Sequence, residues 1–150
     1  MRRRETDDAL MLLHIVARGK IGRGPEAELV ERYLGRIAWP TKVTELPESG
    51  GRVPDRPASG PLILLDEKGE TLGSAQLARR LEAWRDGGAR EAQFRIGGAD
   101  GFDDAARGEA DLLLSFGRAT WPHLLARAML AEQLFRAVSI LASHPYHREG

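Results

Sequence analysis

Residues 116–148 read FGRATWPHLLARAMLAEQLFRAVSILASHPYHR: a glycine-bearing loop, a long apolar segment and a polar tail. Proline is accepted in the first turn of a helix but not in its interior, so Pro122 and Pro145 predict a helix over residues 122–143. Its apolar residues form two adjacent stripes, the first made of Leu124, Ala128, Ala131, Phe135 and Val138 and the second of Leu130, Leu134, Val138 and Leu141. An apolar surface this wide predicts contact with two neighbours, the sheet of the domain and a second surface.

Ahead of this helix, apolar runs of strand length alternate with runs of helical character. Strands are expected at residues 10–17, 41–46, 61–66, 91–96 and 112–116, and helices at 25–38, 74–86 and 103–110. This alternation predicts an α/β fold with a mostly parallel sheet and helices on both faces. The segment 47–60 is rich in glycine and proline and has no periodicity, so it is expected to be a loop.

Ligands of parallel sheets bind beyond the carboxyl ends of the strands. Three segments of the expected fold lie there: Leu65 with Asp66, the glycine-rich turn 97–101, and the loop 117–122. Taken alone, each is typical of an ordinary turn, because glycine and proline interrupt regular structure in most loops. The turn 97–101 also lacks the G-x-G-x-x-G spacing of a dinucleotide-binding loop.

The composition is that of one ordinary globular domain. The chain has 150 residues, with 22 basic against 22 acidic side chains and no cysteine. A disordered leader is expected at residues 1–10 and a single domain at 11–150. A net charge of zero provides no overall attraction to nucleic acid, so RNA binding would need a local patch. No apolar run is long enough to span a bilayer, and the N-terminal segment does not match a signal peptide, which predicts a cytoplasmic protein.

The last quarter of the chain contains three of the four histidines, His123, His144 and His147. They could approach one metal ion, but neither a Glu-x-x-His pattern nor a cysteine accompanies them, and Pro145 breaks the helical register, so no metal site is predicted. In an RNA-facing tail, Tyr146 could stack on a base and Arg148 could hold a phosphate or a developing negative charge. The plainer interpretation is a tail held by packing, with Arg136 forming an exposed helical pair with Glu132.

Six short motifs occur along the chain: Val16-Ala17-Arg18-Gly19-Lys20, Leu64-Leu65-Asp66, Ile96-Gly97-Gly98-x-x-Gly101, Pro122-His123, Arg136-Ala137-x-Ser139-Ile140 and His144-Pro145-Tyr146-His147-Arg148-Glu149. Together they resemble the ribosomal RNA large-subunit methyltransferase H family of the SPOUT superfamily. The resemblance covers nearly the whole chain from Met11 onward, and the C-terminal string is its most specific part.

The resemblance implies a fold whose C-terminal segment threads a loop to form a trefoil knot, and a protein that works as a homodimer. It implies that S-adenosylmethionine methylates N3 of a pseudouridine in 23S rRNA, in the helix at the subunit interface of the assembled ribosome. By the same resemblance, the cofactor would be held by Leu65, Gly97, Gly117, Arg118, Ala119, Thr120, Trp121 and Pro122. The RNA base and the methyl transfer would be served by Arg136, Tyr146 and Arg148.

The chemistry of such a reaction is compatible with these residues. Methyl transfer from a sulfonium to a nitrogen requires in-line placement, and the nitrogen must lose its proton. Because an imide is a weak acid, a guanidinium beside the developing anion would lower the barrier. Arg148 is the candidate for that role, with Tyr146 or His147 relaying the proton. One of the two apolar stripes would face the sheet and the other the symmetry mate, and each tail would lie near the partner's cofactor pocket.

The chain departs from its presumed relatives in two places. Where they carry a longer Lys- and Glu-rich stretch with a helix, it has the short segment 47–60, and where they read Gly-Pro-Glu-Gly, it reads Gly98-Ala99-Asp100-Gly101. Two other functions therefore stay open. One is a knotted methyltransferase acting on a different RNA, and the other is a non-enzymatic nucleotide-binding or ribosome-associated module on the same scaffold.

Overall fold

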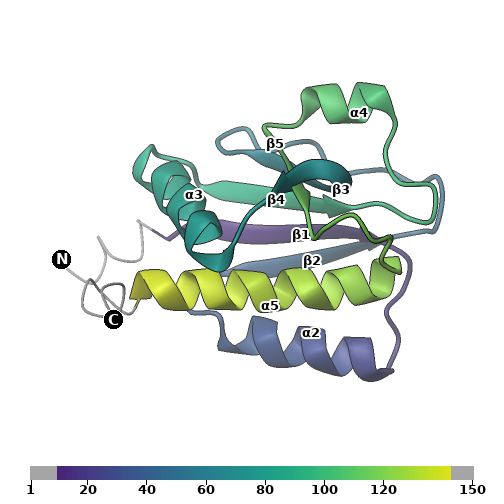
Figure 1. The fold of residues 1–150 in the computed structure, drawn as a ribbon, viewed down its shortest axis with the longest axis horizontal. Coiled ribbons are helices and arrows are strands. Elements are labelled where there is room, and N and C mark those ends of the chain that lie inside the picture. The colour runs from purple at the N-terminus through teal and green to yellow at the C-terminus, as the bar shows by residue number, and fades with distance from the viewer. Residues whose placement is uncertain (1–9, 143–150) are drawn as a thin grey trace.

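The computed structural model describes residues 10–142 and arranges them as one parallel sheet with flanking helices (Figure 1). The strands are β1 (Leu12–Arg18), β2 (Thr41–Leu46), β3 (Leu62–Thr71), β4 (Glu91–Ile96) and β5 (Leu112–Ser115). The helices are α2 (Pro25–Arg36), α3 (Ser74–Asp86), α4 (Asp104–Glu109) and α5 (His123–Ala142). The strand order is β2-β1-β4-β3-β5, and every neighbouring pair is parallel. The predicted α/β class is confirmed.

One face of the sheet carries the main core. Alternate residues of β1 and β4 point to this face and are buried, among them Leu13, Ile15 and Phe94. They pack against α3 and α5, and Figure 1 shows α5 running alongside the strands with α2 and α3 on either side of it. Since parallel strands are covered by the helices of their crossover connections, this is the arrangement that the sequence pattern predicts.

The two apolar stripes of α5 have separate partners within the chain. Leu130, Leu134 and Val138 belong to the main core under the sheet. Ala128 and Ala131 instead form a second cluster with Val30 of α2. The stripe that includes Leu130 and Leu134 therefore faces the sheet, whereas the stripe that includes Ala128 and Ala131 is partly covered by α2, and its small residues allow the two helices to approach closely.

The opposite face of the sheet is more polar than predicted. The side-chain amide of Gln93 donates to the carbonyl of Asp55 at 2.9 Å, and the guanidinium of Arg95 donates to the carbonyl of Pro54 at 2.9 Å. The segment 47–60 thus lies over this face, while α4 contains no buried residue. Within the described residues, a well-packed helical cover is confirmed on one face only, because β4 alternates apolar and polar residues and its polar side binds loop backbone.

A buried histidine bridges three strands on that second face. The Nδ1 atom of His14 lies 2.9 Å from a carboxylate oxygen of Glu91, and its Nε2 atom lies 2.8 Å from the hydroxyl of Thr44. Only 4% of the residue is exposed. Both ring nitrogens have partners, so His14 acts as a structural link between β1, β2 and β4.

Strand β3 continues five residues beyond its predicted end at Asp66. Leu65 and Glu70 both pair with Leu114 of β5, so residues 66–69 form a bulge that leaves the ladder and then returns to it. Gly69 permits the return, because a Cβ atom there would lie 2.3 Å from the carbonyl oxygen of Leu113. The polar composition of this segment concealed the continuation.

Helix α3 begins at Ser74, the first residue of the predicted range, and Gly73 is its N-cap residue. The side-chain oxygen of Gln76 accepts the backbone N–H of Gly73 at 2.8 Å and satisfies the helix terminus. Ser74 is occupied elsewhere, since its hydroxyl donates to the side chain of Gln133 on α5 at 3.0 Å. Among residues 10–142, no helix combines the length and the apolar character that crossing a membrane requires.

Candidate active site

A cleft of about 640 Å³ lies beyond the carboxyl ends of β4 and β5 and beside the start of the bulge in β3. The segments that follow β4 and β5 meet there, as expected for a parallel sheet. Seven of the eight residues predicted to hold the cofactor line it: Leu65, Gly97, Gly117, Ala119, Thr120, Trp121 and Pro122. The eighth, Arg118, is exposed and is not among the residues lining the cleft.

The cleft combines an apolar floor with a polar rim. Its floor includes Leu65, Ile96 and Leu114, which come from three adjacent strands. At the mouth, the indole N–H of Trp121 donates to the carbonyl of Phe116 at 3.3 Å, while 42% of the tryptophan is exposed. An exposed aromatic ring beside an apolar floor suits a flat, partly polar ligand.

Two glycines give the lining its backbone shape. Gly117 has a φ of +110°, which side chains other than glycine rarely adopt. A Cβ atom on Gly97 would lie 3.2 Å from the backbone of Gly101, so the turn 97–101 closes tightly on itself. The glycines therefore expose backbone groups to the cleft rather than side chains.

Asp66 and Arg107 form the buried ion pair of the cleft. The Nε atom of Arg107 donates to the Asp66 carboxylate at 2.7 Å, and the backbone N–H of Lys68 donates to it at 2.9 Å. Burial alone would raise the pKa of Asp66, yet that pKa lies below its ordinary value because these donors bind the charged form. No role was predicted for Arg107, although an acid directly after the buried run 62–65 is itself a signal that a cationic partner is needed.

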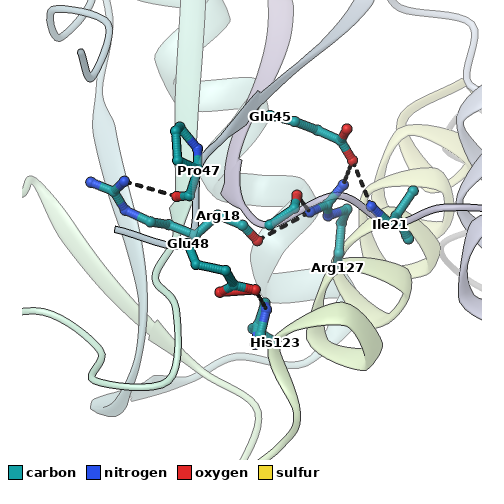
Figure 2. A network of polar contacts seen from close by, with 8 residues as sticks. Arg18, Ile21, Glu45, Pro47, Glu48, His123 and Arg127 are labelled. Atoms are coloured by element: carbon teal, nitrogen blue, oxygen red, sulfur yellow. Dashed lines mark hydrogen bonds and ion pairs between the residues drawn. The ribbon is translucent and has the colours of Figure 1, made fainter. Parts of the chain in front are cut away.

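Arg127 lies in the interior beside the cleft (Figure 2). Its guanidinium donates to Glu45 at 2.5 Å and to the carbonyl of Gly19 at 2.9 Å, and only 1% of its side chain is exposed. Burial works to raise the pKa of Glu45, but that pKa lies below its ordinary value because the N–H of Ile21 and the Arg127 guanidinium bind the carboxylate. Arg127 thereby joins α5 to the ends of β1 and β2.

His123 is the first residue of α5 and lines the cleft. Its Nε2 atom lies 3.1 Å from a carboxylate oxygen of Glu48, in the segment that follows β2 (Figure 2). Gly19, with a φ of +87°, leaves room for this pair, because a Cβ atom there would lie 2.7 Å from Glu48. The Pro-His motif contributed only to the family resemblance, and neither the place of His123 in the cleft nor its carboxylate partner was predicted.

Of the residues predicted for catalysis, the structure describes only Arg136, which does not line the cleft. Arg136 lies beyond the middle of α5, where 58% of its side chain is exposed and its guanidinium pairs with Glu132. Its pKa is raised, primarily by the hydrogen bond to Glu132. Tyr146, His147 and Arg148 lie outside the described residues, as do His144 and the leader at 1–9. Between residues 10 and 142, no group of three or more His, Asp or Glu side chains could hold a metal ion.

Comparison with known proteins supplies the family. The model described as "Predicted SPOUT methyltransferase" matches residues 11–147. The chain is 71% identical to the ribosomal RNA large subunit methyltransferase H of Rhizorhabdus wittichii, over 93% of this chain and 100% of that protein. It is 66% identical to the protein of the same name from Sphingopyxis alaskensis, over 93% and 99% of the two chains.

A more distant relative carries residues that this chain lacks. The methyltransferase H of Paramagnetospirillum magneticum is 48% identical, and the alignment extends over 157 residues, which exceeds the 150 of this chain. It covers 92% of this chain and 99% of the relative. These matches agree with the motifs and with the parallel sheet, and the chain belongs to the SPOUT methyltransferases, within the ribosomal RNA large subunit methyltransferase H family.

Proposed function

We propose that this protein uses S-adenosylmethionine to methylate N3 of a pseudouridine in 23S rRNA of the assembled ribosome, as a cytoplasmic homodimer. The names of its relatives support a methyltransferase of large-subunit rRNA. The modified nucleotide, the knotted C-terminal segment and the dimer come from the resemblance to the family. The net charge of zero is compatible with a folded ribosomal surface as the substrate.

The observation that carries the proposal is the convergence on one cleft of the β3 bulge and the segments that follow β4 and β5. A volume of about 640 Å³ is within the range of small-molecule sites. Leu65 and Ile96 offer apolar surface to an adenine ring, and the glycine turns at Gly97 and Gly117 offer backbone donors and acceptors for its edge and for the ribose. The residues present therefore fit the cofactor, which supplies an electrophilic methyl group when bound.

The chain's own residues orient the reactants and stabilise charge. The loop 117–122 and the turn 97–101 would fix the methyl donor against the floor of the cleft, so that an incoming nitrogen approaches in line. In the proposal, Tyr146 and Arg136 contact the RNA base, and Arg148 stabilises the negative charge that develops as the imide loses its proton. His147 stays a candidate for relaying that proton.

The length of α5 supports a site shared between two subunits. This helix has 20 residues, so its last residue lies about 30 Å from His123 at the cleft. Arg148 is six residues further, and six fully extended residues span only about 20 Å. A tail of the same chain would have to run straight back along α5, whereas a second copy could supply the residue without that constraint.

A surface next to the cleft could receive that copy. A groove of about 530 Å³ lies between α2, α5 and the end of β3, and its lining includes Leu29, Tyr33, Leu125 and Met129. These side chains are only partly buried within one chain. They leave an apolar surface beside the contact between α2 and α5 that a second copy could cover.

Mapping of modified nucleotides in 23S rRNA tests the proposed reaction. Ribosomes from a strain without this protein should lack one N3-methylated pseudouridine, and purified protein with S-adenosylmethionine should restore it. Unchanged 23S rRNA together with a modification lost from another RNA would favour the rival substrate. A folded protein that shows no heat of binding with S-adenosylmethionine would favour the non-enzymatic module.

A further inference from the structure

His123 is the histidine of the cleft that the proposed mechanism has not yet used. It lines the cleft, and 26% of its side chain is exposed, so a ligand can reach it without rearrangement of the core. Its Nε2 edge faces Glu48 and the backbone of Gly19. Within residues 10–142, its Nδ1 atom has no hydrogen-bond partner.

The Glu48 carboxylate selects the form of the ring that can accept a proton. When a carboxylate binds one ring nitrogen, it holds the N–H there and leaves the other nitrogen with a free lone pair. Glu48 accepts from Nε2, so the free lone pair is on Nδ1. The same carboxylate then stabilises the imidazolium that forms after proton transfer, which is the arrangement of general bases in many hydrolases.

The other acids of the cleft are less suited to this task. The Asp66 carboxylate is bound by Arg107 and by the N–H of Lys68, and its pKa is lowered. Glu67 accepts from the hydroxyl of Thr120 at 3.4 Å. A general base works best when its protonation range lies near the working pH, and among side chains imidazole is closest to neutrality.

We propose that His123 is the general base of the methyl transfer, held in its accepting tautomer by Glu48. This inference rests on the proposed function. The Nδ1 lone pair takes the proton of the imide N–H, and the electron pair released on nitrogen forms the bond to the methyl carbon. The sulfur–methyl bond breaks with its electrons remaining on sulfur, which becomes a neutral thioether. The proton passes from the imidazolium to water.

The decisive variant is His123→Gln, assayed in single turnover with ribosomes that lack the modification. General bases contribute about 100-fold to 10,000-fold, so the methylation rate at neutral pH should fall by at least about 100-fold. The dissociation constant of S-adenosylmethionine, measured by calorimetry, should stay within about threefold of the wild-type value, because a general base acts on the chemical step and not on the binding of the cofactor. Thermal unfolding of the variant confirms that it is folded.

The pH dependence of the methylation rate distinguishes a base from a structural residue, because a purely structural role of His123 would give the same rate deficit at every pH. Between about pH 6 and pH 9, carboxylates and guanidinium groups keep their charge. In His123→Gln, which lacks the imidazole, the rate then depends on how much of the substrate imide has already lost its proton. The interpretation requires that the charged groups around His123 keep their charge over this pH range; these groups are Arg18, Glu48, Asp66, Glu67, Asp100 and Arg107. The rate deficit of His123→Gln should therefore shrink steadily as the pH rises, because a substrate that is already ionised needs no base.

Glu48→Gln separates tautomer control from base chemistry. In the wild-type protein, ¹⁵N NMR of the imidazole should show the proton on Nε2, and this signature should be lost in Glu48→Gln, with a rate loss of about tenfold. Glu82→Gln is the matched control, because Glu82 lies on α3 and its carboxylate only reaches Arg85 at 4.0 Å. This control should change neither the signature nor the rate.

The possible failures are distinguishable. A wild-type protein that methylates no ribosome would refute the proposed function itself. If the wild type is active and His123→Gln methylates at the wild-type rate, or if its deficit is the same at every pH, His123 is not the base. A pH-dependent deficit found instead in Tyr146→Phe or His147→Gln would assign the proton to the tail and overturn the inference.

Discussion

Arg127 brings a positive charge into the interior, where its partners must be supplied by the fold. It binds Glu45 and the carbonyls of Gly19 and Arg18, all of which belong to the carboxyl end of β1 and β2. Its Nε atom has no partner among the described residues. A buried arginine inside an otherwise apolar helix stripe is a signal that sequence reading can find, but the three partners are distant in sequence and become visible only in the fold.

Replacing Arg127 with leucine should destabilise the protein by about 2 to 3 kcal/mol. The change leaves the carbonyl of Gly19 buried without a donor, and hydrogen bonds to charged groups are worth about 1.5 to 3 kcal/mol. Urea unfolding measures the difference. Arg136→Leu on the same helix is the control, and because its pair with Glu132 is exposed it should change the free energy of unfolding much less than Arg127→Leu does. Equal effects of the two changes would show that the buried network contributes nothing.

The lowered pKa of Asp66 predicts how stability depends on pH. An acid whose pKa is lower in the folded state stabilises the fold above its unfolded pKa, for which the ordinary value is 3.8, and loses that contribution as the pH falls through the folded pKa. The wild type should therefore lose stability below about pH 4 more steeply than Asp66→Asn. Unfolding midpoints between pH 7 and pH 3 test this, and parallel curves for the two proteins would contradict it.

At the scale of elements, the sequence predicted every strand and helix of the described chain, because most of them have their own apolar period; α4 is the exception, since it is short and polar. The sequence did not predict the features that depend on contacts between segments distant in the chain. The continuation of β3 to Thr71 is specified by pairing with β5 across a bulge, and the polar residues 66–69 give no local sign of it. The segment 47–60 covers the second face because the side chains of Gln93 and Arg95 donate to its backbone carbonyls. The alternation of apolar and polar residues in β4 does not reveal which segment they bind.

Gly69→Ala tests the return of β3 to the sheet. The added Cβ would meet the backbone of Leu113 at 2.3 Å, so the strand must move, and a loss of about 2 kcal/mol or more is expected. Because the bulge 66–69 borders the cleft, binding of S-adenosylmethionine should weaken as well. Gly108→Ala in α4 is the control, since no atom lies within 4 Å of its Cβ and it should stabilise by about 0.4 to 1 kcal/mol. A Gly69→Ala protein as stable as the wild type would show that the close approach is absent.

At the scale of the whole molecule, α5 begins at the cleft and ends far from it. The motifs at its two ends were recognisable from sequence, and the structure brings seven of the eight expected cofactor residues together. The distance between the ends follows from the predicted helix over residues 122–143, and the structure confirms this helix over 123–142. That distance is why the proposal places the tail of a second copy at the cleft.

Two substitutions should separate binding from chemistry. Arg148→Ala should reduce methylation by at least about 100-fold while leaving the affinity for S-adenosylmethionine nearly unchanged, because the guanidinium acts on charge in the transition state. Gly117→Val should instead lose affinity for S-adenosylmethionine, and methylation with it, since valine rarely adopts a φ of +110° and the loop must leave its position. Calorimetry and single-turnover assays measure both. A large loss of cofactor affinity in Arg148→Ala, or unchanged affinity in Gly117→Val, would show that these roles are misassigned.

The same two variants, mixed, test most directly whether one subunit's cleft works with the other subunit's tail. If equal amounts are unfolded and refolded together, half of the dimers contain one copy of each, and each such dimer has one intact site made from the unmodified cleft and the unmodified tail. The mixture should therefore regain about one quarter of wild-type methylation, although each parent alone is inactive. Activity no greater than that of the parents, in a sample shown to contain mixed dimers, would contradict the shared site.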